Sequence, residues 1–251
     1  MMGYTHVAWG AAGAVSLAAL GGDGTPGTYV MAALAGGIGG AAVDIEVKDQ
    51  LSNPKVTDAG RTRLAVLGLI GLGALSDWIF KLGVLSEIIN SGYVALGGVI
   101  SFLVFMAICH FTPHRTFTHS LFFIIISGFC IGAVYPDAAV YYAIGALLHV
   151  ILDLFNHKVI EGHGVWLLYP IKFGDGIALK LCKAGGTGNK VLYFIGLALF
   201  ALGTVMYLYM YKDNGNITAP IIIAIYLIVV LHFVRRKSER ELRHIAHMHG
   251  H

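Results

Sequence analysis

The sequence predicts an all-α membrane protein, a polytopic bundle of about eight transmembrane helices with both termini in the cytoplasm. Three observations lead to this prediction: the composition, a series of apolar stretches, and the placement of the basic residues. Hydrophobic residues make up 57% of the 251 positions and charged residues 12%, against roughly 45 to 50% and about 25% in soluble domains. So few charged residues exclude an ordinary soluble protein. Helices are expected because, within lipid, a helix satisfies its own backbone polar groups.

Apolar stretches follow one another along almost the whole chain. We expect transmembrane helices at His6–Leu20, Thr28–Val43, Leu64–Phe80, Tyr93–Phe111, Ser120–Tyr135, Ala138–Phe155, Val191–Tyr211 and Ile217–Val234. Several are shorter than the roughly 20 residues of a full span, so their bounds are approximate. Leu82–Asn90 is expected along the outer membrane interface. Val165–Ile171 is too short to span and is expected to enter the membrane from the cytoplasmic side.

The basic residues lie in alternate gaps between these stretches. Fifteen of the 17 Lys and Arg residues fall in the second, fourth and sixth gaps or in the C-terminal tail, and only Lys81 and Lys212 fall elsewhere. The positive-inside rule places the fifteen in the cytoplasm. An additional or missing helix would disrupt the alternation, so the pattern supports both the count of eight and the orientation.

A single membrane domain is expected over residues 1–234, with the motifs in about 1–190 and two accessory helices in 191–234. Residues 235–251 form a basic, His-rich cytoplasmic tail suited to anionic lipid. Met1–Gly10 lacks the features of a cleaved signal peptide. The three cysteines indicate no disulfide framework or CxxC metal pair, and the 33 glycines favour close helix packing in lipid.

Polar residues gather at the cytoplasmic ends of four of these helices, most clearly in the sixth. His149, Asp153 and Asn156 share a narrow arc of this helix, and His157 lies somewhat off it. The His-x-x-x-Asp spacing offers an imidazole and a carboxylate to one ion, such as zinc or manganese. The alternative is that His149 and Asp153 only pair with each other. Ion binding is favoured, because ionisable groups at membrane depth are costly and usually functional.

Thr-His occurs twice, each time before an apolar run, as Thr5-His6 and Thr118-His119. A threonine there can cap the helix, and the positive end of the helix keeps the imidazole neutral, which is the form that binds metal. Capping explains the threonines but does not require the histidines. We therefore expect His6 and His119 to be metal ligands.

Four further residues are candidates around the same face. His114 is a candidate general acid or substrate contact, and Arg115 can fork onto a phosphate, although a plain positive-inside anchor is the alternative for Arg115. Asp44 and Glu46 would point about 200° apart on a helix. Asp44 is favoured to bridge metals or accept a proton from water, while Glu46 either orients a ligand or is a solvated loop carboxylate.

Two other features carry weaker signals. The glycine-rich segment Gly185–Lys190 lacks the spacing of a P-loop. It can cradle an anionic headgroup through its backbone N–H groups, or it is a flexible basic loop. The tail histidines are left out of the site because a chain end is usually mobile.

Taken together, these motifs resemble the YdjM-type family of predicted membrane-bound, metal-dependent hydrolases. The motifs recur in the family's order over about the first 190 residues: Thr5-His6, Asp44-Ile45-Glu46, His114 to Ser120, His149 to Asp153, and Leu167-Leu168-Tyr169-Pro170. The family is in turn remotely similar to zinc-dependent phospholipase C and P1-type nucleases, which implies phosphoester hydrolysis.

The chain departs from the family pattern at three positions. Val43 and Val47 stand where relatives often have Pro and His, so one ligand or orienting group is either missing or supplied from elsewhere. The residues that could supply it are His110, His157 and His163. Asn189 stands where an acid is expected, which leaves the role of the glycine-rich segment open.

The expectation is therefore a metal-dependent phosphoester hydrolase of a prokaryotic cytoplasmic membrane, acting on membrane lipids and not on nucleic acid, with its site at the cytoplasmic face. Zinc is the first expected metal and manganese the second. The expected metal ligands are His6, Asp44, His119, His149 and Asp153, with Glu46, Asn156 and His157 as possible additions. The expected catalytic residues are Asp44, His114 and Arg115.

Two other classes of function remain open. A carrier of divalent metal ions is the first, although it should show polar residues at mid-membrane on several helices and an internal repeat. The second is a non-catalytic membrane scaffold, in which the His/Asp cluster is structural.

Overall fold

The structure, a computed structural model, describes the chain apart from residues 22, 48–53, 157–163, 172–173, 214–215 and 249–251, and apart from the side chains of 54–57, 59 and 244–248. Its helices are α1 (Gly3–Gly21), α2 (Pro26–Ala42), α3 (Pro54–Phe80), α4 (Val84–Asn90), α5 (Tyr93–Cys109), the 3₁₀ turn η1 (Phe117–His119), α6 (Leu121–Val134), α7 (Pro136–Leu154), α8 (Thr187–Met210) and α9 (Thr218–Met248). The described residues form no strand, only two isolated β-bridges. The all-α prediction is confirmed.

Each expected apolar stretch overlaps a helix, but the count of eight spans is not supported. Among the described residues, four helices are long and apolar enough to cross a membrane: α7, α8, Gly60–Phe80 of α3 and Thr218–Arg243 of α9. A fifth is added if α4 and α5, which are bent by 99° at a short break, count as one span. Three of the eight expected spans are missing from this set. α2 and α6 are too short, and the many Ala and Gly residues of α1 contribute little hydropathy.

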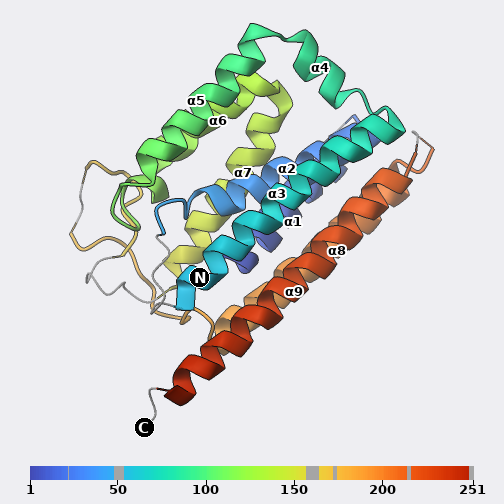
Figure 1. Ribbon diagram of the computed structural model, residues 1–251. Coiled ribbons are helices and arrows are strands. Elements are labelled where there is room, and N and C mark those ends of the chain that lie inside the picture. The colour runs from blue at the N-terminus through green and yellow to red at the C-terminus, as the bar shows by residue number, and fades with distance from the viewer. Residues whose placement is uncertain (22, 48–53, 157–163, 172–173, 214–215, 249–251) are drawn as a thin grey trace.

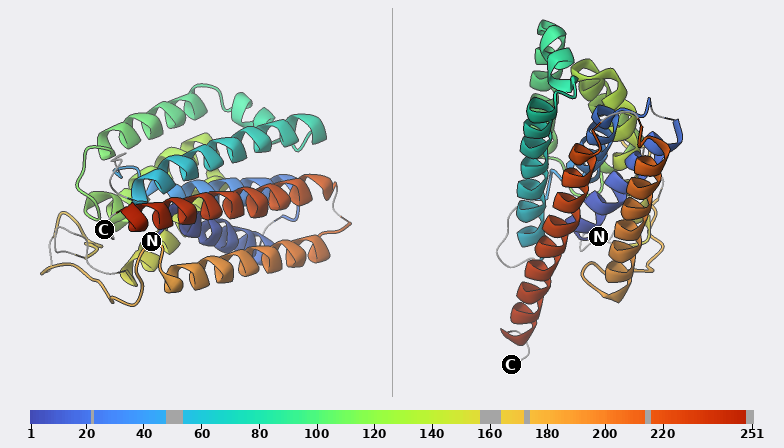
Figure 2. Two further views of the ribbon diagram at one scale, coloured as in Figure 1. Left: turned by 60° about the horizontal axis from the view of Figure 1, so that its bottom comes forward. Right: turned by 90° about the vertical axis from the view of Figure 1, so that its right-hand side faces the viewer.

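The centre of the bundle is α1, which packs against α2, α7 and α8 (Figures 1 and 2). The backbones of these helices nearly touch. A Cβ added to Gly10 would lie 2.3 Å from the carbonyl oxygen of Gly36, and one added to Gly145 would lie 2.2 Å from the same oxygen. Close packing through glycine, expected from the composition, is therefore found where α1, α2 and α7 cross.

The remaining helices surround this centre. α3 packs along α9, while α5 packs on α6, which in turn contacts α7 (Figure 2). The outward side of α5 carries exposed apolar residues such as Val99 and Leu103, as expected for a surface that faces lipid. α9 continues without a break past Val234 to Met248, so the basic residues after Val234 lie on the same helix.

The first turn of α1 is capped by residues from distant helices. α1 begins at Gly3, so Thr5 lies inside the helix and does not cap it. Instead, the backbone N–H of Met2 donates to Asn189 Oδ1 at 3.0 Å, and that of Gly3 donates to Asp58 Oδ2. The expected threonine cap is wrong here, because tertiary contacts supply the acceptors that the first turn needs.

The second Thr-His pair also departs from the expected cap. Ser120, not Thr118, caps α6 by accepting a hydrogen bond from the Phe123 N–H at 3.2 Å. Thr118 lies in η1, and its Oγ1 is 3.1 Å from Nδ1 of His119. Thr118 therefore orients the neighbouring His119 and does not cap a helix.

Candidate metal centre

Four ligand-type side chains converge from three parts of the chain. They are Asp44 after α2, His119 in η1, and His149 and Asp153 on α7, and one ligand atom from each lies within 4.8 Å of the others. His119 Nε2 is 3.6 Å from Asp44 Oδ1 and 3.4 Å from Asp153 Oδ2. His149 Nε2 is 3.5 Å from Asp44 Oδ1. We call these four residues the first group.

Three atoms of the first group are buried and form no hydrogen bond within the described residues: His119 Nε2, His149 Nε2 and Asp44 Oδ1. Leaving a buried polar atom without a partner costs about 1 to 3 kcal/mol. Three such atoms that face one another therefore favour a bound cation. A set of imidazole nitrogens and carboxylate oxygens fits zinc or manganese.

The tautomer of His149 is fixed by its second nitrogen. Nδ1 lies 2.7 Å from the carbonyl oxygen of Gly40. A carbonyl can only accept, so Nδ1 carries a proton, and in the neutral ring Nε2 is the nitrogen that can bind a metal ion in the first group. The contact depends on close packing of α2 on α7, since a Cβ on the neighbouring Gly39 would lie 2.2 Å from the backbone oxygen of Tyr142.

His6 lies directly beside the first group. Its ring stacks on that of His149, with centroids 3.6 Å apart and an angle of 11° between the planes. Its Nε2 is 3.3 Å from Asp153 Oδ1, and the residue is fully buried. The structure thus places all five expected ligands together.

A second group overlaps the first and consists of Asp44, Glu46, His114 and His119. His114 Nδ1 lies 2.8 Å from Glu46 Oε1 and 4.0 Å from Asp44 Oδ1. Asp44 and His119 belong to both groups, so the two candidate sites share ligands.

The two acidic residues are not arranged as expected for a helix. α2 ends at Ala42 and the chain turns over residues 43–46, which brings both carboxylates to the same side. Glu46 is the more buried, since its side chain is 0% exposed and that of Asp44 is 17% exposed. Burial raises the pKa of Glu46 to about 7. Burial would also raise the pKa of Asp44, but His149 and His114 hold it well below its usual range.

The turn that carries Asp44 and Glu46 is held by hydrogen bonds to its backbone. Arg63 Nη2 of α3 donates to the carbonyl oxygens of Asp44, Ile45 and Val47 at 3.3, 3.1 and 3.0 Å. His110 Nδ1 lies 2.8 Å from the Ile45 oxygen. His110 was one candidate for the missing ligand, but here it supports the turn.

Arg115 is fully buried, and the structure does not place it where it could fork onto a phosphate. Its Nε lies 3.3 Å from Asp153 Oδ2. With the Asn156 amide turned to satisfy its neighbours, Arg115 Nη2 donates to the Asn156 oxygen at 2.9 Å. Arg115 and Asn156 therefore support the ligand Asp153. His157 and His163 lie outside the described residues.

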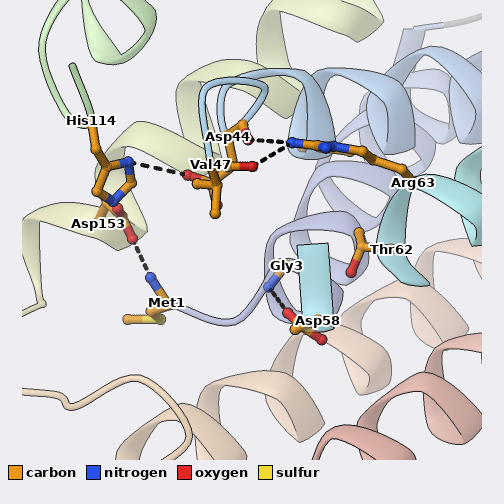
Figure 3. A pocket seen from close by; sticks show the side chains of 11 residues that line it. Met1, Gly3, Asp44, Val47, Asp58, Thr62, Arg63, His114 and Asp153 are labelled. Carbon is orange, nitrogen blue, oxygen red and sulfur yellow. Dashed lines mark hydrogen bonds and ion pairs between the residues drawn. The ribbon is translucent and has the colours of Figure 1, made fainter. Parts of the chain in front are cut away.

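A pocket opens beside the two groups (Figure 3). Asp44, His114 and Asp153 line it together with Asp58, Thr62 and Arg63 of α3. The sequence patterns did not single out Asp58 or Thr62, and Arg63 entered only as a basic residue. The signal available for finding Asp58 and Thr62 was their spacing of four residues, just before the third apolar stretch begins.

No curated protein and no solved structure matches this chain. A family model described as YdjM inner membrane protein matches residues 1–237, well beyond the first 190. The chain therefore belongs to the YdjM family of inner membrane proteins.

Proposed function

We propose that this protein is an integral membrane metal-dependent hydrolase that cleaves a phosphoester of a lipid headgroup at the cytoplasmic face. The observation that carries the proposal is the pair of overlapping groups, whose buried nitrogen and oxygen atoms face one another beside a pocket. The motif resemblance to predicted membrane-bound hydrolases supports the same reaction class.

A divalent ion bound here would supply a water of lowered pKa and offset charge on the phosphoryl oxygens. The side chains have distinct tasks around it. Asp44, shared by both groups, can hold two ions or accept the proton of the attacking water. His149 is held in the binding tautomer by Gly40, and Arg115 supports Asp153. His114, at the wall of the pocket, can contact the phosphate.

The proposed side of the membrane follows from the basic residues. Ligand residues lie after the end of α2, before α6 and at the end of α7, which are the ends beside the basic gaps of the sequence, and at the start of α1, which packs against α2 and α7. By the positive-inside rule this end is cytoplasmic. The proposal keeps eight membrane-embedded segments, with α1 and α2 enclosed by the others, and both termini inside.

One observation favours a hydrolase over a metal carrier. A transport path needs ionisable groups along the depth of the membrane, whereas both groups in the described residues lie at one end of the helices. The buried Asp77 near the other end of α3 is already engaged, since it accepts hydrogen bonds from the backbone of Val84 and Leu85 at 2.8 and 3.1 Å.

The test measures metal content and lipid cleavage on protein purified in detergent. Elemental analysis should find stoichiometric zinc or manganese, and a panel of headgroup-labelled lipids should show release of a headgroup. His149→Ala should lose both metal and cleavage. His232→Ala, on α9 outside both groups, should retain them. A wild-type protein without stoichiometric metal, or a folded His149→Ala variant that still cleaves lipid, would contradict the proposal. Metal uptake into proteoliposomes would favour the carrier instead.

A further inference from the structure

We propose that Asp58 is the acid that protonates the departing alcohol oxygen, and that the surface of α3 carrying Asp58 and Thr62 receives this part of the substrate. This inference rests on the proposed hydrolase function. Asp58 belongs to neither of the two groups, so it is free of the task of binding metal.

Asp58 is held in one orientation inside the pocket. Its Oδ2 accepts the backbone N–H of Gly3, and its Oδ1 accepts the Ser238 hydroxyl at 3.0 Å. It is 1% exposed, yet it lines the same pocket as Asp44 and Asp153 (Figure 3). A fixed carboxyl group in the wall of a pocket that the candidate metal ligands also line can act as a general acid on an ester bound there.

Thr62 gives independent evidence that a ligand contacts this surface. It follows Asp58 by one helical turn, so both side chains lie on the same face of α3. Thr62 is 3% exposed and lines the pocket, and its Oγ1 has no hydrogen-bond partner among the described residues. A buried hydroxyl without a partner is unfavourable, and a substrate oxygen would satisfy it.

The protonation chemistry of Asp58 agrees with this geometry. Burial raises the pKa of Asp58 to about 6. A carboxyl group with such a pKa is partly protonated near neutral pH, where a general acid is most effective. Each carboxyl oxygen that accepts one hydrogen bond still has a second lone pair, so the group can carry a proton while it keeps both existing contacts.

The step balances without any oxidant or reductant. The oxygen of water forms the new bond to phosphorus, and the bond from phosphorus to the alcohol oxygen breaks with its electron pair left on that oxygen. Asp58 gives its proton to the departing oxygen, while Asp44 accepts the proton of the water and then releases it to solvent. The products are an alcohol and a phosphate species, and Asp58 regains a proton from solvent.

The experiment compares two leaving groups in the full-length, metal-loaded protein. One substrate is a phosphoester with an alkyl alcohol, whose oxygen must be protonated as it leaves. The other is the matching p-nitrophenyl ester, whose phenolate leaves without a proton. Asp58→Asn should lower kcat for the alkyl ester by about 100-fold and for the nitrophenyl ester by less than about threefold, with unchanged metal content.

Two further variants keep the test decisive. Asp77→Asn changes a buried carboxylate on the same helix outside the pocket, and its rates on both esters should match wild type. Asp58→Glu retains an acid and should recover part of the lost rate on the alkyl ester alone. Equal losses on both esters in folded Asp58 variants, or no loss on either, would overturn the proposal. If the proposed function itself fails, the wild-type protein cleaves neither ester.

Discussion

The two ends of the bundle both carry buried carboxylates, but they satisfy them differently. At one end, the buried Asp77 accepts two backbone hydrogen bonds, from Val84 and Leu85 of α4. At the other end, Asp44 Oδ1 faces the imidazoles of His119 and His149 without a hydrogen bond. The Asp77 oxygens at the first end have hydrogen-bond partners, whereas the second end has buried atoms without partners that a cation would satisfy. Substitutions at the two ends should therefore have different consequences.

The largest effect is expected from Asp44→Asn, because this residue belongs to both groups. Removal of a residue that merely orients a ligand costs about 10- to 100-fold in metal affinity or activity, so loss of a shared ligand should cost at least about 100-fold. His114→Ala, which affects only the second group, should retain more metal. Elemental analysis and cleavage rates measure both. Equal metal loss in the two variants would argue against Asp44 as the shared ligand.

A smaller effect is expected from Gly40→Ala, which separates α1 from α2 where they carry the site. The new Cβ would lie 2.4 Å from the backbone oxygen of His6, so α2 must move away from α1, and this movement displaces the Gly40 oxygen that His149 contacts. We expect metal affinity to fall by about 10- to 100-fold, as measured by competition with a chelator. Gly71→Ala is the matched control because its Cβ would meet nothing within 4 Å. If both glycine variants bind metal like wild type, the packing does not position His149.

The third prediction concerns stability and pH. Burial raises the pKa of Asp58 from 3.8 to about 6. The folded state therefore holds this proton more tightly than the unfolded state. Protonation of Asp58 stabilises the folded state fully below pH 3.8, and this contribution is lost as pH rises through about 6. Asn does not titrate, so the variant does not lose this stability. The free energy of unfolding of Asp58→Asn, relative to that of wild type, should therefore rise by up to about 2 kcal/mol from pH 4 to pH 7.5. Thermal unfolding at both pH values measures this gain. A constant difference would show that the Asp58 carboxyl titrates normally.

The smallest effect is expected at the other end, from Asp77→Asn. The substitution weakens the hydrogen bonds to the first turn of α4 and should cost about 1 kcal/mol of stability. Metal content and cleavage should not change, because the residue belongs to neither group. A loss of metal in this variant would mean that the two ends are not independent.

The candidate site was predictable where it depends on local spacing. His149 and Asp153 are four apart on one helix, and the two Thr-His pairs lie at helix starts, so these residues could be assigned to one membrane face. The burial of Glu46 could not be predicted, because it depends on the path of a turn held by Arg63. The role of Asp58 was hidden for a similar reason, since it depends on contact between α1, α3 and α9.

The fold was predictable as a set of apolar helices but not as a set of spans. α1 and α2 are rich in small residues that bring backbones together, so their burial comes from packing with other helices. Hydropathy alone cannot distinguish such a helix, enclosed by protein, from one that faces lipid. The caps of α1 were also beyond local patterns, because Asn189 and Asp58 lie far from it in the chain.

These distant caps also set the order in which the protein can be assembled. The first turn of α1, which carries His6, receives hydrogen bonds from Asn189 on α8 and from Asp58, whose other oxygen is held by Ser238 on α9. A chain is synthesised from its N-terminus, so the residues that complete this turn are made well after the turn itself. The ligand-bearing end of α1 therefore receives its full set of hydrogen bonds only after α8 and α9 have been made.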